Sequence, residues 1–170
     1  MTQYLDHSPM EGEYLNGRFL SPPLVVRPEW IDFNGHLNMA YYGVLFDTGC
    51  NHGFTALGFG EAYRRDQGLT TMMADLRIRY LRELHEGDRV RCSFRIVKVG
   101  SRAFHFCQEL IHTDGWVAAT AEAVNLHVDI AQRKVVPYGD EKRKLLDDMA
   151  KIHADWPLPD WVGADLGVRS

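Results

Sequence analysis

The stretch Arg-Pro-Glu-Trp-Ile-Asp-Phe-Asn-Gly-His-Leu-Asn-Met-Ala-Tyr-Tyr, residues 27–42, is the most informative part of this sequence, because a polar loop in it leads directly into an apolar segment with helical spacing. Asp32 stands between the large apolar residues Ile31 and Phe33, and Gly35 breaks the chain just before the expected helix. The first N–H groups of a helix have no partner within it, so they favour an anion. A carboxylate able to act as nucleophile or base therefore stands beside a site that can receive negative charge.

The segment after this loop is typical of a helix that is buried along one face. Apolar and small residues recur at spacings of three and four: Leu37, Ala40, Tyr41, Val44, Leu45 and Thr48. The pattern ends near Gly58 or Gly60. Gly43, Gly49 and Gly53 each cost up to about 1 kcal/mol relative to Ala inside a helix, so we expect this helix to pack closely against something flat, such as a sheet.

Strand-like runs lie on both sides of the expected helix. A short first strand is expected at residues 24–27, and apolar and charged residues alternate at 75–80, after the polar segment 61–68. Three longer runs follow at 89–99, 102–113 and 116–128, separated by the turn signals Gly100-Ser101 and Asp114-Gly115. Such long strands curve around a helix that they cover. We therefore expect an α+β fold in which a curved antiparallel sheet wraps a long central helix.

A chain of 170 residues is expected to form one domain. Residues 1–22 are interpreted as an irregular N-terminal arm, residues 23–139 as the helix-and-sheet domain, and residues 140–170 as a C-terminal helix and tail of the same domain. Asp140 is a suitable N-cap for that short helix, and the tail from Trp156 is expected to lack regular structure.

Composition narrows the possible functions. A formal net charge of -4, from 19 Lys and Arg against 23 Asp and Glu, disfavours nucleic acid as a partner. No apolar run approaches the ~20 residues that span a bilayer, and the N-terminus has no signal-peptide pattern. The three cysteines, Cys50, Cys92 and Cys107, lie in apolar segments and form no Cys-x-x-Cys, so a soluble protein of the reducing cytoplasm is expected.

Several familiar catalytic motifs are absent. The sequence has no Gly-x-Ser-x-Gly, no phosphate loop and no Gly-x-Gly-x-x-Gly. None of its eight histidines stands in a His-Glu-x-x-His or Cys/His cluster, so no metal site is expected. His105 and His127 are interpreted as structural residues on strands. Three arginines either face solvent on the outer side of the sheet or bind phosphates: Arg77, Arg79 and Arg82.

At Asp32 a structural interpretation competes with a catalytic one. Asp and Asn before a helix are usually caps, and Asn34 or Asn38 is an equally suitable cap. However, four polar residues stand within seven positions: Asp32, Asn34, His36 and Asn38. One cap does not need four polar groups, so we favour a functional site.

The run Asp32-Phe33-Asn34-Gly35-His36-Leu37-Asn38, followed by Tyr41 or Tyr42, resembles the Asp-x-x-Gly-His-hydrophobic-Asn signature of hotdog-fold acyl-CoA thioesterases of the 4-hydroxybenzoyl-CoA thioesterase type. The order of strand, long helix and long antiparallel strands over residues 24–137 is also similar to the hotdog order. Within the family, residues 30–36 are most similar to the branch that includes betainyl-CoA thioesterase. Many members carry a further Asp where this chain has Trp30, so the role of that Asp has no counterpart here.

The resemblance implies a role for each polar residue. Asp32 corresponds to the catalytic carboxylate, which either attacks the thioester carbonyl or activates a water; the residues do not decide between these. Backbone N–H groups around Met39 would hold the oxyanion. Asn38 would orient the water or the substrate, and Asn34 or His36 would hold the loop and tune the carboxylate.

The substrate implied is a coenzyme A thioester, with no resident cofactor. Four aromatic residues either line the acyl pocket, where they can bind a quaternary ammonium by cation–π contact, or belong to the hydrophobic core: Trp30, Phe33, Tyr41 and Tyr42. Candidate contacts for the coenzyme A phosphates lie near expected turns: Arg102, Arg133 and Lys134. Asp47, a second carboxylate on the helix, lines a pocket or faces solvent and is left out of the catalytic set.

The resemblance also implies a homodimer or homotetramer with the acyl pocket at the subunit interface. Two other functions remain open from the sequence. One is a hotdog hydratase or dehydratase, in which His36 and Asp32 move a proton and leave the thioester intact. The other is a protein that binds acyl-CoA without hydrolysing it. The identity of the acyl group is also open.

Overall fold

A computed structural model describes residues 13–15 and 18–164 of the chain. Its elements, in chain order, are β1 Glu13–Leu15, β2 Arg18–Leu20, β3 Leu24–Val25, the 3-10 helix η1 Pro28–Trp30, α1 Met39–Ala56, α2 Glu61–Gln67, β4 Leu69–Tyr80, β5 Arg89–Val99, β6 Ala103–His112, β7 Val117–Asp129, β8 Lys134–Val135 and α3 Asp140–Ala154. All strand pairs are antiparallel, in the order β1-β2-β5-β6-β7-β4, with β3 beside β5 and β8 beside β7.

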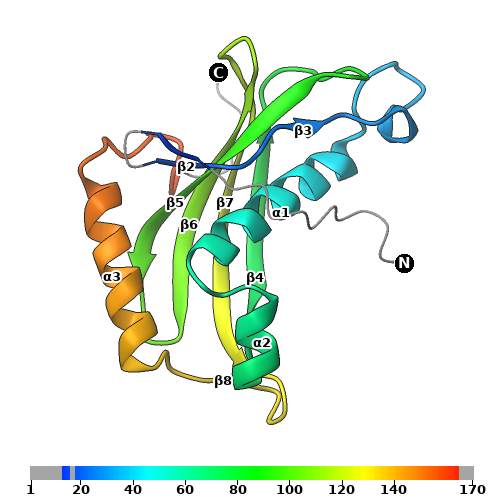
Figure 1. Cartoon of the computed structure of the whole chain (residues 1–170). Helices are drawn as coiled ribbons and strands as arrows, with labels where there is room; N and C mark the ends of the chain where they lie inside the picture. Colours follow the sequence, from blue (N-terminus) through cyan, green and yellow to red (C-terminus); the bar gives the residue numbers. More distant parts are fainter. Residues whose placement is uncertain (1–12, 16–17, 165–170) are drawn as a thin grey trace.

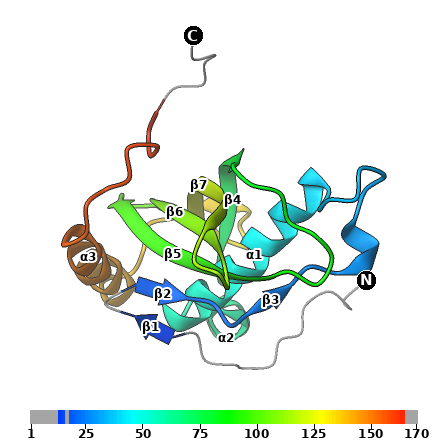
Figure 2. The same ribbon diagram turned by 90° about the horizontal axis from the view of Figure 1, so that it is seen from above.

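The long strands curve around α1, as Figures 1 and 2 show from two directions. The predicted architecture, a long central helix wrapped by a curved antiparallel sheet with a C-terminal helix, is confirmed. The strands β5, β6 and β7 span 11, 10 and 13 residues, close to the predicted runs. Their turns lie where the glycine signals stand: Gly115 has φ +89°, and Gly100 N–H donates to the carbonyl of Ala103 (2.8 Å).

Glycine lets α1 approach the sheet. A Cβ atom at Gly49 would collide with the side chain of Cys92 on β5, and one at Gly53 would lie 3.0 Å from Cγ of Phe94. The predicted close packing is thus confirmed at these two positions, whereas Gly43 has no neighbour within 4 Å. The buried face of α1 is shifted from the predicted stripe because these glycines belong to it: Tyr42, Leu45, Phe46, Gly49, Cys50, Gly53 and Phe54.

The structure differs from the sequence expectation in several places, one of which is the start of β4, at Leu69 rather than near residue 75. Within the predicted irregular arm, β1 and β2 form a hairpin that pairs with β5, while the rest of that arm lies outside the described residues. The first predicted strand is shortened to β3 because Pro28 starts a 3-10 helix. The polar segment 61–68 forms α2, which has no buried residue and so no apolar pattern. The N-cap of α3 is Gly139 rather than Asp140.

Helix α3 packs against β5 and is anchored there by a buried histidine. The Nδ1 atom of His153 accepts the N–H of Ile96 (3.0 Å), and the side chain is 2% exposed. The second buried core cluster, which is rich in phenylalanine, includes Leu146 of α3. None of the described helices has the length and apolar character needed to span a membrane.

The strand β4 has an unusual environment for a long strand. It pairs with β7 on one side, and no strand among the described residues pairs with its other side. Its central residues 72–76 are all exposed. The exposed apolar side chains on and just after this strand are Met72, Met73, Leu76, Tyr80 and Leu81.

Candidate functional site

The Asp32 loop is closed by backbone hydrogen bonds at its base. The N–H of Asp32 donates to the carbonyl of His36 (2.9 Å), and the N–H of Gly35 donates to the carbonyl of Asp32 (3.0 Å). Ile31 and Leu37 form an isolated β-bridge below these bonds. Gly35 has φ +83°, a conformation that favours glycine. The loop is therefore a tight turn with fixed ends.

This turn is attached to the chain that leaves β4. Leu37 N–H donates to the carbonyl of Leu84 (2.7 Å), and both leucine side chains are buried. Asn38 N–H donates to the carbonyl of Trp30 (3.0 Å). Hydrogen bonds and buried leucines thus hold the Asp32 loop beside the connection between β4 and β5.

A cleft of about 470 Å³ opens where the Asp32 loop, the start of α1 and the end of β4 meet. Five residues that the sequence assigned to the site line it: Asp32, His36, Asn38, Met39 and Tyr42. Residues 80–83 form the opposite wall, and the rings of Tyr42 and Tyr80 meet edge to face at 5.1 Å. The fold therefore brings part of the predicted site together with a segment 40 residues further along the chain.

The carboxylate of Asp32 is half-buried and is used only in part by the turn. Its Oδ1 accepts the N–H of Asn34 (2.8 Å). Among the described residues, the carboxylate has no other hydrogen-bond or ion-pair partner, so Oδ2 is available for chemistry. Asn34 itself is exposed and does not line the cleft.

The start of α1 has one unpaired amide in the cleft region. Asn38 is the N-cap: its side chain accepts the N–H of Ala40 (3.0 Å), and its carbonyl accepts the N–H of Tyr41 (2.9 Å). Within the described part of the chain, the N–H of Met39 has no acceptor. An unpaired donor at a helix start favours an anion. The capping alternative thus holds for Asn38, and the free amide is that of Met39.

The four predicted aromatic residues lie in different environments. Tyr42 lines the cleft, and burial raises the pKa of its hydroxyl. Trp30 is buried in the core and stacks on the half-buried ring of Tyr41, with centroids 5.4 Å apart. Phe33 is 98% exposed at the tip of the loop. Only Tyr42 among them therefore borders the cleft within one subunit.

The predicted coenzyme A contacts lie away from the cleft. Arg102 is in the turn between β5 and β6, and Arg133 and Lys134 are at the turn between β7 and β8. Measured along β4, the strand register places these turns roughly 25–35 Å from Tyr80 at a rise of about 3.3 Å per residue. Arg82 lines the cleft instead, with its guanidinium 4.1 Å from the centroid of the Trp116 ring.

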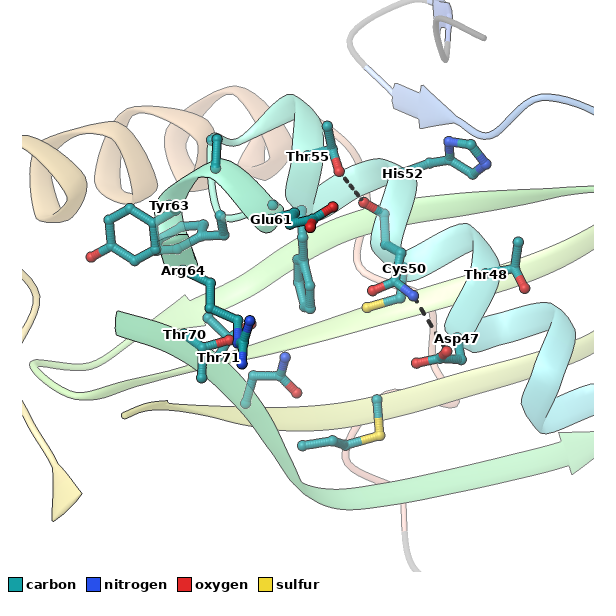
Figure 3. A pocket seen from close by; sticks show the side chains of 18 of the residues that line it. Asp47, Thr48, Cys50, His52, Thr55, Glu61, Tyr63, Arg64, Thr70 and Thr71 are labelled. Atoms are coloured by element: carbon teal, nitrogen blue, oxygen red, sulfur yellow. Dashed lines mark hydrogen bonds between the residues drawn. The ribbon is translucent and has the colours of Figure 1, made fainter. Parts of the chain in front are cut away.

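A second, larger cavity of about 780 Å³ lies between α1, α2 and β4. Figure 3 shows Asp47, Thr48 and Cys50 of α1 on one side, with Thr70 and Thr71 of β4 opposite. Partial burial raises the pKa of Asp47, and its hydrogen bond from Asn51 Nδ2 (3.3 Å) opposes that shift. Asp47 therefore lines a pocket. The sequence alone did not distinguish this position from one that merely faces solvent.

The wall residues Tyr80, Arg82 and Glu83 were not predicted as site residues. They follow the loop by more than 40 positions, and only the register of β4 and the bond between Leu37 and Leu84 place them beside it. The one signal in the sequence was the group of arginines near the end of the strand.

The profile of the Thioesterase-like superfamily matches residues 26–162 of this chain. Betainyl-CoA thioesterase of Pseudomonas aeruginosa is 26% identical over 144 residues, which cover 84% of this chain and 91% of that protein.

Solved structures share the architecture. A Staphylococcus aureus protein determined in complex with CoA superposes with a TM-score of 0.82 at 21% identity, covering 94% of this chain and 98% of that one. A DHNA-CoA thioesterase from Staphylococcus aureus superposes with a TM-score of 0.74 at 15% identity, covering 84% and 97% of the two chains. Their likeness shows that this chain has the hotdog fold.

Proposed function

The chain belongs to the thioesterase-like superfamily and is an enzyme of the thioester hydrolase class; we propose that it hydrolyses an acyl-CoA thioester in the cleft beside Asp32. The observation that carries this proposal is the lining of one cleft by a partly unpaired carboxylate and by the first residue of α1, whose amide has no acceptor among the described residues. Hydrolysis of a thioester needs both an attacking group and a donor for the oxyanion.

The proposed role of Asp32 is to begin the attack through Oδ2. Either this oxygen adds to the thioester carbonyl, which gives a mixed anhydride that water then hydrolyses, or it takes a proton from a water that adds directly. In both routes the C–S bond breaks and the thiolate of coenzyme A leaves. A thiolate is a good leaving group, so no strong general acid and no resident cofactor are required.

The proposed oxyanion donor is the N–H of Met39. The cap provided by Asn38 uses the next two amides and leaves this one available. The dipole of the 18-residue helix α1 adds to the favourable potential at this end. In this proposal Asn38 acts by positioning that amide, and His36 and Tyr42 bound the reacting group.

We propose that the acyl group of the substrate is small, and a cationic acyl group is one candidate. The relative from Pseudomonas aeruginosa is named for betainyl-CoA. In this chain Tyr42 and Tyr80 present aromatic rings at the cleft, and such rings attract a quaternary ammonium. Arg82 is the proposed basic contact for coenzyme A from within the same subunit.

We further propose that the working unit is a homodimer or a larger homo-oligomer formed through β4. An unpaired strand edge with exposed apolar side chains favours pairing with another chain. Both the cleft and the larger cavity border β4, so a second subunit placed there would cover them and exclude water. The three cysteines are buried and form no disulfide within the described residues, which fits a proposed location in the reducing cytoplasm.

The test of the proposed activity is a panel of short, aromatic, long-chain and betainyl CoA thioesters, assayed for released thiol and for reversible hydration of α,β-unsaturated members. Hydrolysis predicts stoichiometric thiol and free acid from at least one thioester. Reversible hydration without thiol would instead support the hydratase alternative. Tight binding of acyl-CoA that is neither hydrolysed nor hydrated would support a binding protein.

A further inference from the structure

We propose that His36, Glu83 and His85 form a binding site for a divalent transition-metal ion, with Zn²⁺ as the best match, at the mouth of the cleft. One ligand atom from each residue lies within 4.8 Å of the others. The Nε2 atom of His36 is 3.2 Å from Oε2 of Glu83. The rings of His36 and His85 meet edge to face, with centroids 5.2 Å apart.

The two buried leucines explain why the three side chains gather. The backbone hydrogen bond between Leu37 and Leu84 fixes the two segments side by side. Leu84 is fully buried, whereas its neighbours Glu83 and His85 have side chains that are 67% and 59% exposed. His36 likewise precedes the buried Leu37. The ligands therefore project on the outer side of a frame that the core holds in place.

The three donor atoms suit Zn²⁺ and similar divalent transition-metal ions. Two imidazole nitrogens and one carboxylate oxygen are ordinary Zn²⁺ ligands, at about 2.0–2.2 Å from the ion. Two donors at that distance in a tetrahedral site are roughly 3.3 Å apart, and His36 and Glu83 already have that spacing. Exposed side chains such as His85 can rotate to close the remaining gap. Three protein ligands leave a fourth position for water.

A second carboxylate is placed to orient His85. Asp88 Oδ2 accepts the backbone N–H of His85 (2.8 Å) and lies 3.9 Å from its Nδ1 atom. Histidines that bind metals commonly direct their other ring nitrogen to a carboxylate. If Nδ1 moves about 1 Å closer to Asp88, to hydrogen-bond distance, Nε2 of His85 is left as the metal ligand.

This site was not predicted from the sequence because its ligands come from two segments separated by more than 40 residues. No motif of local spacing can show such a set. The expectation that the chain has no metal site depended on such motifs alone.

Metal binding at this position would act on the cleft. His36 and Glu83 line it together with Asp32, so a bound ion would tie the Asp32 loop to the connection after β4 and place two positive charges near the Asp32 carboxylate. Attraction at short range would hold the Asp32 carboxylate in an ion pair with the metal. A carboxylate held in this way is less able to attack the thioester or to take a proton from water. We therefore expect Zn²⁺ to inhibit thioester hydrolysis reversibly. This consequence, unlike the binding itself, rests on the proposed function.

The competing explanation is a surface histidine–glutamate pair without a metal. The chain contains a less exposed example of such a pair: His105 Nε2 lies 2.8 Å from Oε1 of Glu122, and this pair belongs to no three-ligand group among the described residues. His105→Gln is therefore the control for His85→Gln. His85 does not line the cleft, so His85→Gln leaves the proposed hydrolytic groups in place.

The experiment measures Zn²⁺ binding to the full, untagged, chelator-treated protein by calorimetry, and Co²⁺ binding by visible absorption. We expect one equivalent of Zn²⁺ per chain and a Co²⁺ spectrum of low coordination number. His85→Gln and Glu83→Gln should each weaken binding by at least about 10-fold, and His105→Gln should leave it unchanged. No stoichiometric binding, or equal binding by wild type and His85→Gln, would overturn the proposal.

The inhibition is measured separately, as initial rates of thiol release before the product thiol accumulates enough to bind zinc. We expect Zn²⁺ to inhibit the wild type and His105→Gln, chelator to restore the rate, and His85→Gln to resist inhibition. Binding without inhibition would contradict the effect on the cleft but not the metal site. Absence of any hydrolysis would count against the proposed function and leave the binding result intact.

Discussion

Asp32 combines a structural role with a proposed chemical one. Oδ1 closes the turn by accepting the N–H of Asn34, while Oδ2 has no partner among the described residues. An amide at this position would preserve the turn, since Asn also offers an oxygen acceptor, but it could neither attack a carbonyl nor take a proton. The turn and the chemistry can therefore be separated by one substitution.

His153 predicts how stability depends on pH. Burial, with a smaller effect of Arg95, lowers its pKa from 6.5 to about 4 in the folded chain. The unfolded chain therefore binds the proton more readily, so the stabilisation is complete above about pH 6.5 and is lost as pH falls toward 4. We expect the protonation of His153 to lower the free energy of unfolding by roughly 2 kcal/mol between pH 7 and pH 4.

The measurement is urea unfolding between pH 7 and pH 4 for wild type and His153→Asn, which keeps an acceptor for Ile96 N–H but does not titrate. The carboxylates contribute equally to both proteins. The variant should therefore lose less stability over this range than the wild type. Parallel pH profiles would show that His153 is not the group responsible.

At the scale of elements, contact between α1 and β5 depends on glycine. Gly49→Ala must displace the side chain of Cys92, whereas Gly53→Ala needs only a few tenths of an ångström from Phe94. Both changes gain up to about 1 kcal/mol of helix propensity. We expect Gly49→Ala to destabilise the protein by about 2 kcal/mol and Gly53→Ala to cost less.

The free energies of unfolding of the two alanine variants, measured by chemical denaturation, test this packing. Gly43→Ala is the matched control for propensity, because a Cβ there meets nothing within 4 Å in the subunit. Equal stabilities for the variants at 49 and 53 would mean that α1 does not approach β5 as closely as described.

Local sequence patterns predict some of the elements and miss others. The strands β5, β6 and β7 were predicted nearly to the residue because alternation and glycine turns are local signals. The helix α2 was missed because it buries no residue, and a helix without a buried face has no apolar period. The buried face of α1 was misplaced because the predicted stripe followed Tyr41, Val44 and Thr48, whereas the glycines expected to pack on the sheet lie on the neighbouring face with Phe46 and Cys50.

The candidate site divides in the same way. The Asp32 loop and the start of α1 are contiguous, so the sequence predicted them together. The opposite wall and the proposed metal ligands Glu83 and His85 depend on where β4 ends relative to α1, which no local pattern contains. The aromatic residues predicted to line one pocket lie apart within the subunit, because Trp30 is buried in the core and Phe33 faces solvent.

At the scale of the whole molecule, the exposed edge of β4 predicts association. Leu76 is 40% exposed at the centre of this strand. Leu76→Lys should place a charge in the proposed interface, shift the protein toward the 19.5 kDa subunit and reduce thiol release, because the cleft would lose its cover. Ile152→Lys, at a 46% exposed position on α3, is the matched control.

Light scattering after size-exclusion chromatography, combined with thiol-release rates, checks this prediction. The wild type and Ile152→Lys should be oligomeric and equally active. A wild type that is monomeric and fully active would show that β4 does not complete the site.

The proposed role of the Asp32 carboxylate in hydrolysis is tested by the rate of thiol release by Asp32→Asn, compared with wild type and Asp47→Asn, on the best substrate of the panel. Unfolding curves of all three establish that they are equally folded. We predict that Asp32→Asn lowers kcat by about 100- to 10,000-fold with its stability unchanged. Full turnover by Asp32→Asn, with the loss found in Asp47→Asn instead, would rule out this role of Asp32 and place the chemistry in the larger cavity.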